Sequence, residues 1–444
     1  MMSPLNVSQY IDISLKFDLV IFDEASQIFT EDALASIVRG NQVIIAGDSK
    51  QLPPCDFFKA GDITQDDEET YIEEENKISN SLLDAADTIL GTDLSKQLLW
   101  HYRSSDECLI DFANKHMEYN LITFPSAYKD PNNGIRYHQI PYHPSTCYDA
   151  GKSGSHTNKG EARKILDIIY DEMNNPERKH FSIGVVAFSN AQALLIEEMW
   201  NEYKNQPDKK PLIDEWERNH QKEEIVFCNL DTMQGDERDT MIISTCYSKD
   251  KNGKLNLTYL GRIRLESGKK RINVAITRSR HQMIVVTTLD RATLDNALST
   301  TIAPEEHKEG AIMLKEFLKY AEAYAASNDL PSTPTSNEFV KSICDVLDEY
   351  GIKYQTEIGA SKCKINIGIL DKYDDTKYAL GIIIDDPRRE DFDSPREYAR
   401  LTGQVLTKKY GWKLYRVFPI SWFYNYKNEK VKLLEVIGKA LDRA

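Results

Sequence analysis

The sequence of 444 residues lacks the features that mark metal-bound, disulfide-linked and membrane-spanning proteins. Its seven cysteines are scattered, and no two of them form a Cys-x-x-Cys pair, so neither a zinc site nor a disulfide framework is indicated. No apolar run is long enough to cross a membrane, and the chain does not open with a signal-peptide pattern. We therefore expect a cytoplasmic protein whose cysteines are mostly reduced and buried.

Basic residues are too few to balance the acidic ones. Lysine and arginine together number 55 against 70 aspartates and glutamates, and the formal net charge is −15. Binding to nucleic-acid phosphates requires Lys and Arg, but a local basic groove is enough, because net charge is an average over the whole surface. Much of the excess acid lies in residues 62–75, which we interpret as a solvated loop.

What the sequence does contain is an alternation of strand and helix patterns. Its length allows two or three domains, and its composition is typical of a globular protein. Continuous apolar runs predict buried strands at residues 183–188, 225–227, 241–245 and 283–287. Helical patterns over 191–203 and 308–326 accompany them, and such alternation implies a mostly parallel sheet. Residues 327–336, rich in Pro, Ser and Thr, predict a linker.

Two apolar runs near the start of the chain end abruptly in acidic residues. The first leads into Asp23 and Glu24, and the second leads through a glycine into Asp48. Because their apolar residues are continuous, both runs predict strands that are buried on both faces. Ligands of a parallel sheet bind beyond the carboxyl ends of its strands. We therefore expect these acids, and Gln51 shortly after them, at one edge of a sheet.

Paired carboxylates at the end of a strand suit nucleotide hydrolysis. One acid can hold Mg²⁺, directly or through water, while its neighbour orients the attacking water. An isolated Asp-Glu pair can also merely end a strand. The second strand, its Gly-Asp turn and the Gln-Leu-Pro-Pro segment follow at close spacing, which favours the functional interpretation.

Both stretches resemble motifs of superfamily 1 helicases. Residues 23–26 (Asp-Glu-Ala-Ser) resemble the Walker B box of these proteins, and residues 47–54 (Gly-Asp-Ser-Lys-Gln-Leu-Pro-Pro) resemble their third motif. Residues 2–10 are similar to the segment that precedes these motifs in a bacterial group of large helicase-related proteins.

The resemblance implies roles for the residues that it matches. Asp23 would serve Mg²⁺ and Glu24 the attacking water. Gln51 would relay to the γ-phosphate of ATP, and Asp48 would belong to the nucleotide site.

Three later segments continue the resemblance. Residues 98–104 resemble the fourth helicase motif, residues 229–239 the fifth and residues 273–280 the sixth. The forms Gln-Gly-Asp-Glu-Arg-Asp and Thr-Arg-Ser-Arg are similar to those of the branch that contains the nonsense-decay RNA helicases, which implies movement from 5′ to 3′. Any one arginine among them could instead form a surface salt bridge, but the order of the motifs argues against coincidence.

The resemblance also implies roles within these three segments. Arg103 and Arg278 would be arginine fingers, because a planar and permanently charged guanidinium can bind two phosphate oxygens at once. Gly235 would permit close backbone approach to a phosphate, and Glu237 is expected near the ribose. Arg280 would support nucleic-acid contact or coupling.

Basic residues gather just before the sixth motif, at Arg262, Arg264, Lys269, Lys270 and Arg271. They predict a track for a single-stranded backbone, with a solvated hairpin as the plain alternative. The aromatic residues of the fourth motif, Trp100, His101 and Tyr102, could stack on bases or pack into the interior.

One motif of this helicase class is absent. The sequence has no Gly-x-x-x-x-Gly-Lys-[Ser/Thr], the Walker A loop that cradles phosphates and supplies a lysine. In this class the loop lies upstream of the Walker B box. We therefore expect the chain to be the rear portion of a longer protein, with the upstream Walker A segment as its partner, and to hydrolyse essentially no ATP alone.

Residues 337–444 resemble a Vsr-like domain, the very-short-patch-repair endonuclease shape of the PD-(D/E)xK nucleases. The strongest match is residues 410–423, but Asn366 and Ile383 stand where the family has acids, and Asp385 and Asp386 leave room only for a rearranged metal site. Because a nuclease metal needs several carboxylates, we predict a degenerate nuclease retained for DNA binding or docking. The patterns within it predict a helix, a strand and a second helix at 338–350, 380–384 and 395–409.

The predicted fold class is α/β, with a RecA-like parallel-sheet helicase core followed by an α+β restriction-endonuclease-like domain. The expected parts are the end of a first RecA-like domain, a complete second one, a helix with a linker, and the nuclease-like domain, at residues 1–90, 91–305, 306–336 and 337–444. The predicted function is an ATP-dependent helicase or translocase that uses ATP and Mg²⁺ on single-stranded DNA or RNA. Two alternatives stay open: a DNA-docking or defence-complex module without ATPase activity, and a metal-dependent endonuclease.

Overall fold

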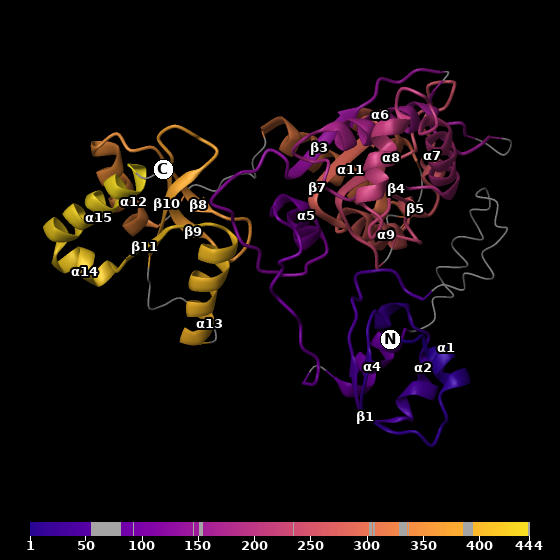
Figure 1. The fold of residues 1–444 in the computed structure, drawn as a ribbon, viewed down its shortest axis with the longest axis horizontal. Helices are drawn as coiled ribbons and strands as arrows, with labels where there is room; N and C mark the ends of the chain where they lie inside the picture. The colour runs from indigo at the N-terminus through magenta and orange to yellow at the C-terminus, as the bar shows by residue number, and fades with distance from the viewer. Residues whose placement is uncertain are drawn as a thin grey trace. The chain divides into compact units, whose positions relative to one another are not determined.

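The computed structural model describes residues 1–54, 81–91, 93–144, 146–150, 154–233, 235–301, 304, 307–327, 335, 337–384 and 394–442. The predicted acidic loop at 62–75, Asp385 and most of the predicted linker lie outside these residues. The chain forms two compact units, whose elements are labelled in Figure 1. The core unit comprises residues 1–98, 136–279 and 283–322, and the terminal unit comprises residues 99–135, 280–282 and 323–444.

The core unit begins with a two-stranded parallel sheet. Strands β1 (Phe17–Phe22) and β2 (Gly40–Ile45) pair along their length. The predicted strands are confirmed, but the prediction that both faces are buried is wrong, since Ile21 is 62% exposed and Ile44 is 50% exposed. The sheet has only two strands within the described residues, so most of its apolar side chains have no strand or helix to cover them.

Short helices flank this sheet. They are α1 (Pro4–Tyr10), the 3-10 turn η1 (Ala25–Gln27), α2 (Thr30–Ile37) and α4 (Leu82–Leu90). Helix α4 begins with a reciprocal cap between Ser81 and Asp84. A small core of Phe22, Ala25, Ala33 and Leu82 joins β1, η1, α2 and α4.

A five-stranded sheet, in the order β3-β7-β6-β4-β5, forms the larger part of the core unit. Strand β4 is parallel to both β5 and β6. All five residues of β4 are buried, as its continuous apolar sequence predicted. The strands are β3 (Gly134–Gln139), β4 (Ile183–Ala187), β5 (Val226–Asn229), β6 (Arg238–Ser244) and β7 (Ser279–Thr287).

Helices surround this sheet (Figure 1), and the first three of those named next supply side chains to its core. They are α6 (Lys159–Asn174), α7 (Asn190–Tyr203), α8 (Lys210–Asn219), the 3-10 segment η2 (Leu257–Arg264), α9 (Glu266–Ile276), α10 (Arg291–Thr300) and α11 (Glu309–Ser327). The helices predicted at 191–203 and 308–326 are confirmed as α7 and α11 within one residue at each end. The alternation of helices with parallel strands confirms a RecA-like α/β core.

The terminal unit holds a mixed four-stranded sheet in the order β11-β10-β9-β8. Strands β8, β9 and β10 are antiparallel neighbours, whereas β11 runs parallel to β10. The elements are α12 (Glu338–Glu349), β8 (Tyr354–Ile358), β9 (Ile365–Leu370), β10 (Tyr378–Ile384), α13 (Pro395–Arg400), η4 (Leu401–Lys409), β11 (Leu414–Val417), α14 (Pro419–Tyr424) and α15 (Tyr426–Leu441). The helix predicted over 395–409 forms, but its second part, η4, is π-helical.

The segment that carries the fourth motif, residues 99–135 with helix α5 (Cys108–His116), packs within the terminal unit. Ile122 and Phe124 enter a core with β9, β10 and η4, and the Trp412 indole donates a hydrogen bond of 2.8 Å to the Pro125 carbonyl. Chain contacts thus group this segment with the nuclease-like domain. The domain boundaries expected at residues 90, 305 and 336 remain predictions.

Candidate nucleotide site

The first two acids lie where the sequence predicts, directly after β1. The Glu24 amide donates to Asp23 Oδ1 over 3.0 Å, and the Gln27 side chain donates to Glu24 Oε2 over 3.3 Å. The backbone of Glu24 is left-handed, with φ of 52°. Side chains other than glycine rarely adopt this conformation, and such residues cluster at functional sites.

The loops after β1 and β2 approach each other closely. The Ala25 amide donates to the Ala46 carbonyl over 2.9 Å, and the Ala46 amide donates to the Phe22 carbonyl over 2.8 Å. A Cβ atom on Gly47 would lie only 3.0 Å from the Ser26 amide nitrogen, so glycine suits this position. The acids after both strands are therefore held at one edge of the sheet.

Asp48 organises the turn that positions Gln51. Its two carboxylate oxygens accept hydrogen bonds of 2.9 Å, one from the Lys50 amide and one from the Gln51 side chain. The backbone amide of Gln51 also donates to the backbone carbonyl of Asp48 over 3.1 Å. The side-chain nitrogen of Gln51 is thus engaged by Asp48, and its side-chain oxygen is left to accept from another donor.

That donor is Arg278, two residues after the end of α9. Its guanidinium donates to Gln51 Oε1 over 2.6 Å and to the Val274 carbonyl over 3.1 Å. Asn273 supports the same approach by donating to the Lys50 carbonyl over 3.0 Å. Arg278 is 2% exposed. Residues of the third and sixth motifs, more than 200 positions apart in sequence, therefore meet within the core unit.

The other residues assigned by resemblance are not all joined to this group. Gly235 lies in an exposed turn with φ of 94°, which favours glycine, and Glu237 follows it, half-buried, just before β6. Arg103 is exposed and, like Arg280, belongs to the terminal unit.

The predicted nucleic-acid track contains residues in different settings. Arg264 is buried with 3% exposure, and Lys269 forms an ion pair with Glu309. Arg271 pairs with Asp231 over 3.1 Å. Arg262 and Lys270 are half-buried. A nucleic-acid role for this group remains a prediction.

Sequence reasoning missed a buried polar network at the ends of β6 and β7. Glu161, fully buried in the first turn of α6, accepts from Ser244 Oγ over 2.7 Å and from the amides of Cys246 and Thr288 over 2.8 Å each. Burial raises the pKa of Glu161. The cap residue Asn158 also bonds to Thr288 Oγ1 over 2.6 Å. The Asn-x-x-Glu pattern of a helix start was the available signal.

In the nuclease-like domain, Asn366 and Ile383 lie in the sheet and its core. The side-chain oxygen of Asn366 accepts a hydrogen bond of 2.8 Å from the Ile384 amide, so it links strands β9 and β10. Ile383 is 2% exposed and packs in the core that Ile122 and Phe124 enter. Within the described residues no cluster of three or more His, Cys, Asp or Glu side chains is arranged to hold a metal ion. Asp385 lies outside them.

Three protein families match the chain. An AAA domain family (AAA_11) matches residues 6–57, a second AAA domain family (AAA_12) matches residues 80–290, and the family REase_MTES_1575 matches residues 339–437. AAA domain families thus match the first two parts of the chain, and a nuclease-like family matches the last. With the relatives described next, these matches support the likeness to superfamily 1 helicases that the motifs indicated.

The relatives include proteins described as helicases. The chain is 32% identical over 316 residues to the uncharacterized ATP-dependent helicase MG140 homolog of Mycoplasma pneumoniae, a match that covers 70% of this chain and 26% of that protein. It is 27% identical over 299 residues to the DNA polymerase alpha-associated DNA helicase A of Saccharomyces cerevisiae, covering 61% of this chain and 38% of that protein. The chain spans about a quarter of the length of its Mycoplasma relatives.

Solved structures with some likeness include helicases. The helicase nonstructural protein 10 of an arterivirus is 12% identical, with a TM-score of 0.27, over 62% of this chain and 40% of that chain. The C-terminal domain of a possible DNA helicase from Lactobacillus is 9% identical, with a TM-score of 0.23, over 42% of this chain and 88% of that chain.

No described helix of the protein is long and apolar enough to cross a membrane.

Proposed function

We propose that this chain is part of an ATP-dependent motor that moves along single-stranded DNA or RNA. In this proposal Asp23 holds Mg²⁺, and the positive charge of the ion would balance the negative charge of the phosphates. Glu24 orients the attacking water. Both are acids at the carboxyl edge of a parallel strand, with oxygen donors of the kind that Mg²⁺ binds.

The observation that carries the proposal is the chain of contacts from Asp48 through Gln51 to Arg278. Asp48 fixes the amide of Gln51, and the amide oxygen is bound by Arg278. A γ-phosphate that displaced this oxygen would receive the guanidinium charge at the moment when negative charge builds up. Gln51 would then couple the presence of the γ-phosphate to the position of α9.

The remaining residues fill supporting roles in the same proposal. Arg103 would supply a second guanidinium to the transferring phosphate. Gly235, with an open and exposed backbone, would admit a phosphate closely, and Glu237 would lie near the ribose. Arg262, Lys270 and Arg280 would contribute positive charge toward a nucleic-acid backbone.

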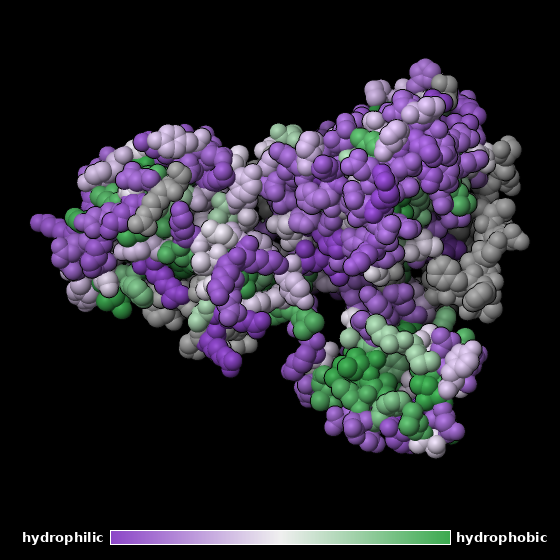
Figure 2. All heavy atoms as spheres, viewed as in Figure 1, coloured by the Kyte–Doolittle hydropathy of each residue, from purple (hydrophilic) through white to green (hydrophobic). Residues whose placement is uncertain are grey.

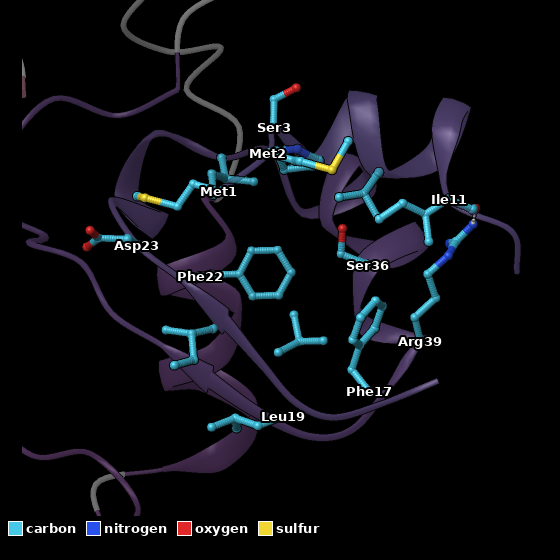
Figure 3. Close-up of a pocket in the computed structure, with 15 residues that line it drawn as sticks. Met1, Met2, Ser3, Ile11, Phe17, Leu19, Phe22, Asp23, Ser36 and Arg39 are labelled. Carbon is cyan, nitrogen blue, oxygen red and sulfur yellow. Dashed lines mark hydrogen bonds between the residues drawn. The ribbon is translucent and has the colours of Figure 1, made fainter. Parts of the chain in front are cut away.

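The first sheet offers a place for the missing phosphate loop. An apolar hollow of about 760 Å³ borders β1, lined by residues such as Phe17, Leu19, Phe22 and Ile28 (Figure 3). Figure 2 shows hydrophobic side chains gathered over this part of the core unit. In the proposal, further strands of the first RecA-like domain, bearing the Walker A loop, pack beside β1 and β2. This upstream segment is the partner that catalysis requires.

The test is ATP turnover by the chain alone and joined to an upstream Walker A segment, each with single-stranded nucleic acid. We expect essentially no turnover from the chain alone. The joined protein should hydrolyse ATP, with stimulation by nucleic acid, and Glu24→Gln should lower turnover by about 10²-fold or more, because the attacking water loses its base.

Glu31→Gln is the matched control, since Glu31 is an exposed glutamate in the first turn of α2. It should leave turnover unchanged. Turnover by the chain alone that Glu24→Gln abolishes would refute the claim that Walker A is required. Nucleic-acid binding without turnover in either form would instead support the docking-module alternative.

A second proposal concerns the nuclease-like domain, which we infer binds DNA without cutting it. The engaged amide of Asn366 and the buried Ile383 support this role. Metal-dependent cleavage of DNA that Asp385→Ala abolishes would overturn it.

A further inference from the structure

A hollow in the nuclease-like domain lies between its first helix, α12, and its last two helices, α14 and α15, which are labelled in Figure 1. The hollow has a volume of about 660 Å³. Its floor is apolar, because Val346 and Trp422 are buried and belong to the core of the domain. Its described lining includes none of the residues assigned to the nucleotide site or to the predicted nucleic-acid track. The hollow is therefore a separate feature of the molecule.

Aromatic rings form one wall of the hollow, and part of this wall is open to solvent. The Trp422 ring packs edge-on against Phe339, with ring centres 6.3 Å apart, and against Tyr426, with ring centres 5.4 Å apart. Phe423 is 84% exposed beside them, and Tyr426 is 44% exposed. The same short stretch also exposes Phe418, Ile420 and Tyr424. Large apolar side chains that gather on a surface in this way are typical of a binding site for another molecule.

The other wall of the hollow is acidic. Helix α12 contributes Glu338, Asp345 and Glu349, whose helical spacing places them on one face. Lys430 neutralises Glu349 through an ion pair of 2.6 Å, whereas Glu338 and Asp345 form no ion pair within the described part of the chain. These two acids are seven residues apart, which is about 10 Å along the helix axis. Two uncompensated negative charges therefore flank the aromatic wall.

The charge of the hollow indicates which class of occupant it fits. Glu338 and Asp345 would repel the phosphates of a nucleic acid or of a lipid headgroup. A second copy of this chain carries a net charge of −15, so the same repulsion opposes its approach. A segment that is both apolar and cationic would instead cover Phe423 and gain charge complementarity with the two acids.

We propose that this hollow binds an amphipathic helix of a partner protein whose polar side is basic. The apolar face of that helix would lie on Phe423 and Tyr426, as in other complexes in which a helix fills a groove. Lysine or arginine side chains seven positions apart on the helix would match the spacing of Glu338 and Asp345. The inference goes beyond the proposed motor and beyond DNA binding, because the occupant is a protein and its binding needs neither nucleotide nor nucleic acid.

The test uses two dye-labelled synthetic peptides of equal length, each an amphipathic helix in which leucine alternates with one charged residue type. The charged residue is lysine in the first peptide and glutamate in the second. Fluorescence anisotropy measures their binding to the whole chain with Ile21→Lys and Ile44→Lys, two substitutions that keep the exposed apolar residues of the first sheet from capturing peptide. We expect the lysine peptide to bind this parent at least about tenfold more tightly than the glutamate peptide.

Two variants of the hollow test the two walls. Phe423→Ala should weaken binding of the lysine peptide about tenfold, because the most exposed aromatic anchor is lost. Glu338→Lys with Asp345→Lys should exchange the preference, so that the glutamate peptide binds more tightly than the lysine peptide. A variant that failed to fold could not gain this affinity. All three positions are exposed, and thermal melting would show that the fold is retained.

A matched control exists elsewhere in the same domain. Tyr373 is 79% exposed and Asp375 is an exposed acid close to it in sequence, but neither of them lines the hollow. Tyr373→Ala with Asp375→Asn should bind both peptides like the parent. This control separates the hollow from a general effect of exposed rings and acids.

Several results would overturn the inference. They are equal affinity of the parent for the two peptides, parent-like binding by both variants of the hollow, and an equal loss of binding in the Tyr373/Asp375 control. Light scattering that showed a dimer dissolved by Phe423→Ala would also overturn it, since the hollow would then hold a second copy of the chain. ATP turnover by the joined protein remains a separate readout of the motor, which none of these results affects.

Discussion

At the scale of single residues, Glu107 stands out because it is an acid in a shielded setting at the start of α5. It accepts hydrogen bonds from the Thr123 hydroxyl and the Ala360 amide, yet burial, with Asp106 and Asp111 nearby, raises its pKa to about 7. The folded terminal unit thus favours the protonated form of Glu107, whereas the unfolded chain ionises it near 4.5.

This shift predicts that Glu107 weakens the fold as pH rises. Between about pH 4.5 and 7 the folded state binds one more proton than the unfolded state, so the stabilisation is complete below that window and is lost by about 3 kcal/mol across it. Glu107→Gln should therefore flatten the decline in stability between pH 5 and 8. Denaturant unfolding at several pH values would measure it.

Two comparisons make this prediction decisive. The low pKa of His101 produces the opposite slope in an overlapping window, so the difference between parent and variant is the informative quantity. Glu435→Gln, an exposed glutamate on α15, is the control and should leave the profile unchanged. Identical profiles for the parent and Glu107→Gln would contradict a raised pKa.

At the scale of elements, the Glu161 network connects the start of α6 to the ends of β6 and β7. Glu161→Ala would leave the amides of Cys246 and Thr288 buried without acceptors. Each such orphaned group costs about 1–3 kcal/mol, so we expect a loss of at least about 3 kcal/mol in the free energy of unfolding. Glu198→Ala, at an exposed position on α7, should change it by less than about 0.5 kcal/mol.

Strand β10 allows a test of whether the nuclease-like domain can be repaired. Ile383→Glu returns the acid that the family has, but the side chain lies in a core with Ile122, Phe124 and Trp412. A buried unpaired charge costs several kcal/mol. We expect the variant to melt at a lower temperature and to gain no cleavage of DNA in Mg²⁺ or Mn²⁺.

The surface of the same domain provides the contrast. Asn428→Glu, on the exposed side of α15, should melt like the parent. Metal-dependent cleavage of DNA by Ile383→Glu would contradict the prediction, because it would mean that the fourth-motif segment does not keep residue 383 buried.

Sequence patterns predicted elements better than they predicted surroundings. Continuous apolar runs located β4, β6, β7 and β10, because period and composition are local properties. The same rule predicted burial at Ile21 and Ile44, which are exposed, because burial depends on neighbouring strands that a single run does not encode. The contact of Gln51 with Arg278 joins positions 227 apart, and spacing alone gave no distance between them.

At the scale of the whole molecule, the apolar face of the first sheet predicts self-association of the isolated chain. Ile21→Lys with Ile44→Lys should raise solubility and reduce binding of a hydrophobic dye, without lowering the melting temperature, since both side chains are at least half exposed. Static light scattering and dye fluorescence would measure the effect. Joined to the upstream segment, the same variant should fail to gain ATP turnover.

An isolated exposed leucine supplies the control for that prediction. Leu194 is 57% exposed on α7, a helix that packs on the five-stranded sheet and not on the first sheet. Leu194→Lys should change neither solubility nor dye binding. An equal response to both variants would show that general surface charge, rather than the apolar face, governs association.

The bond between Trp412 and the Pro125 carbonyl spans 287 positions, and this has a consequence for synthesis in the cell. A ribosome that adds about 5–20 residues per second needs about 15 to 60 s to travel that far. During this interval Ile122 and Phe124 have been made, but the strands and helix that bury them have not. The nascent chain therefore carries an unshielded apolar segment for about 15 to 60 s, which offers a binding site for a chaperone until translation of the last domain is complete.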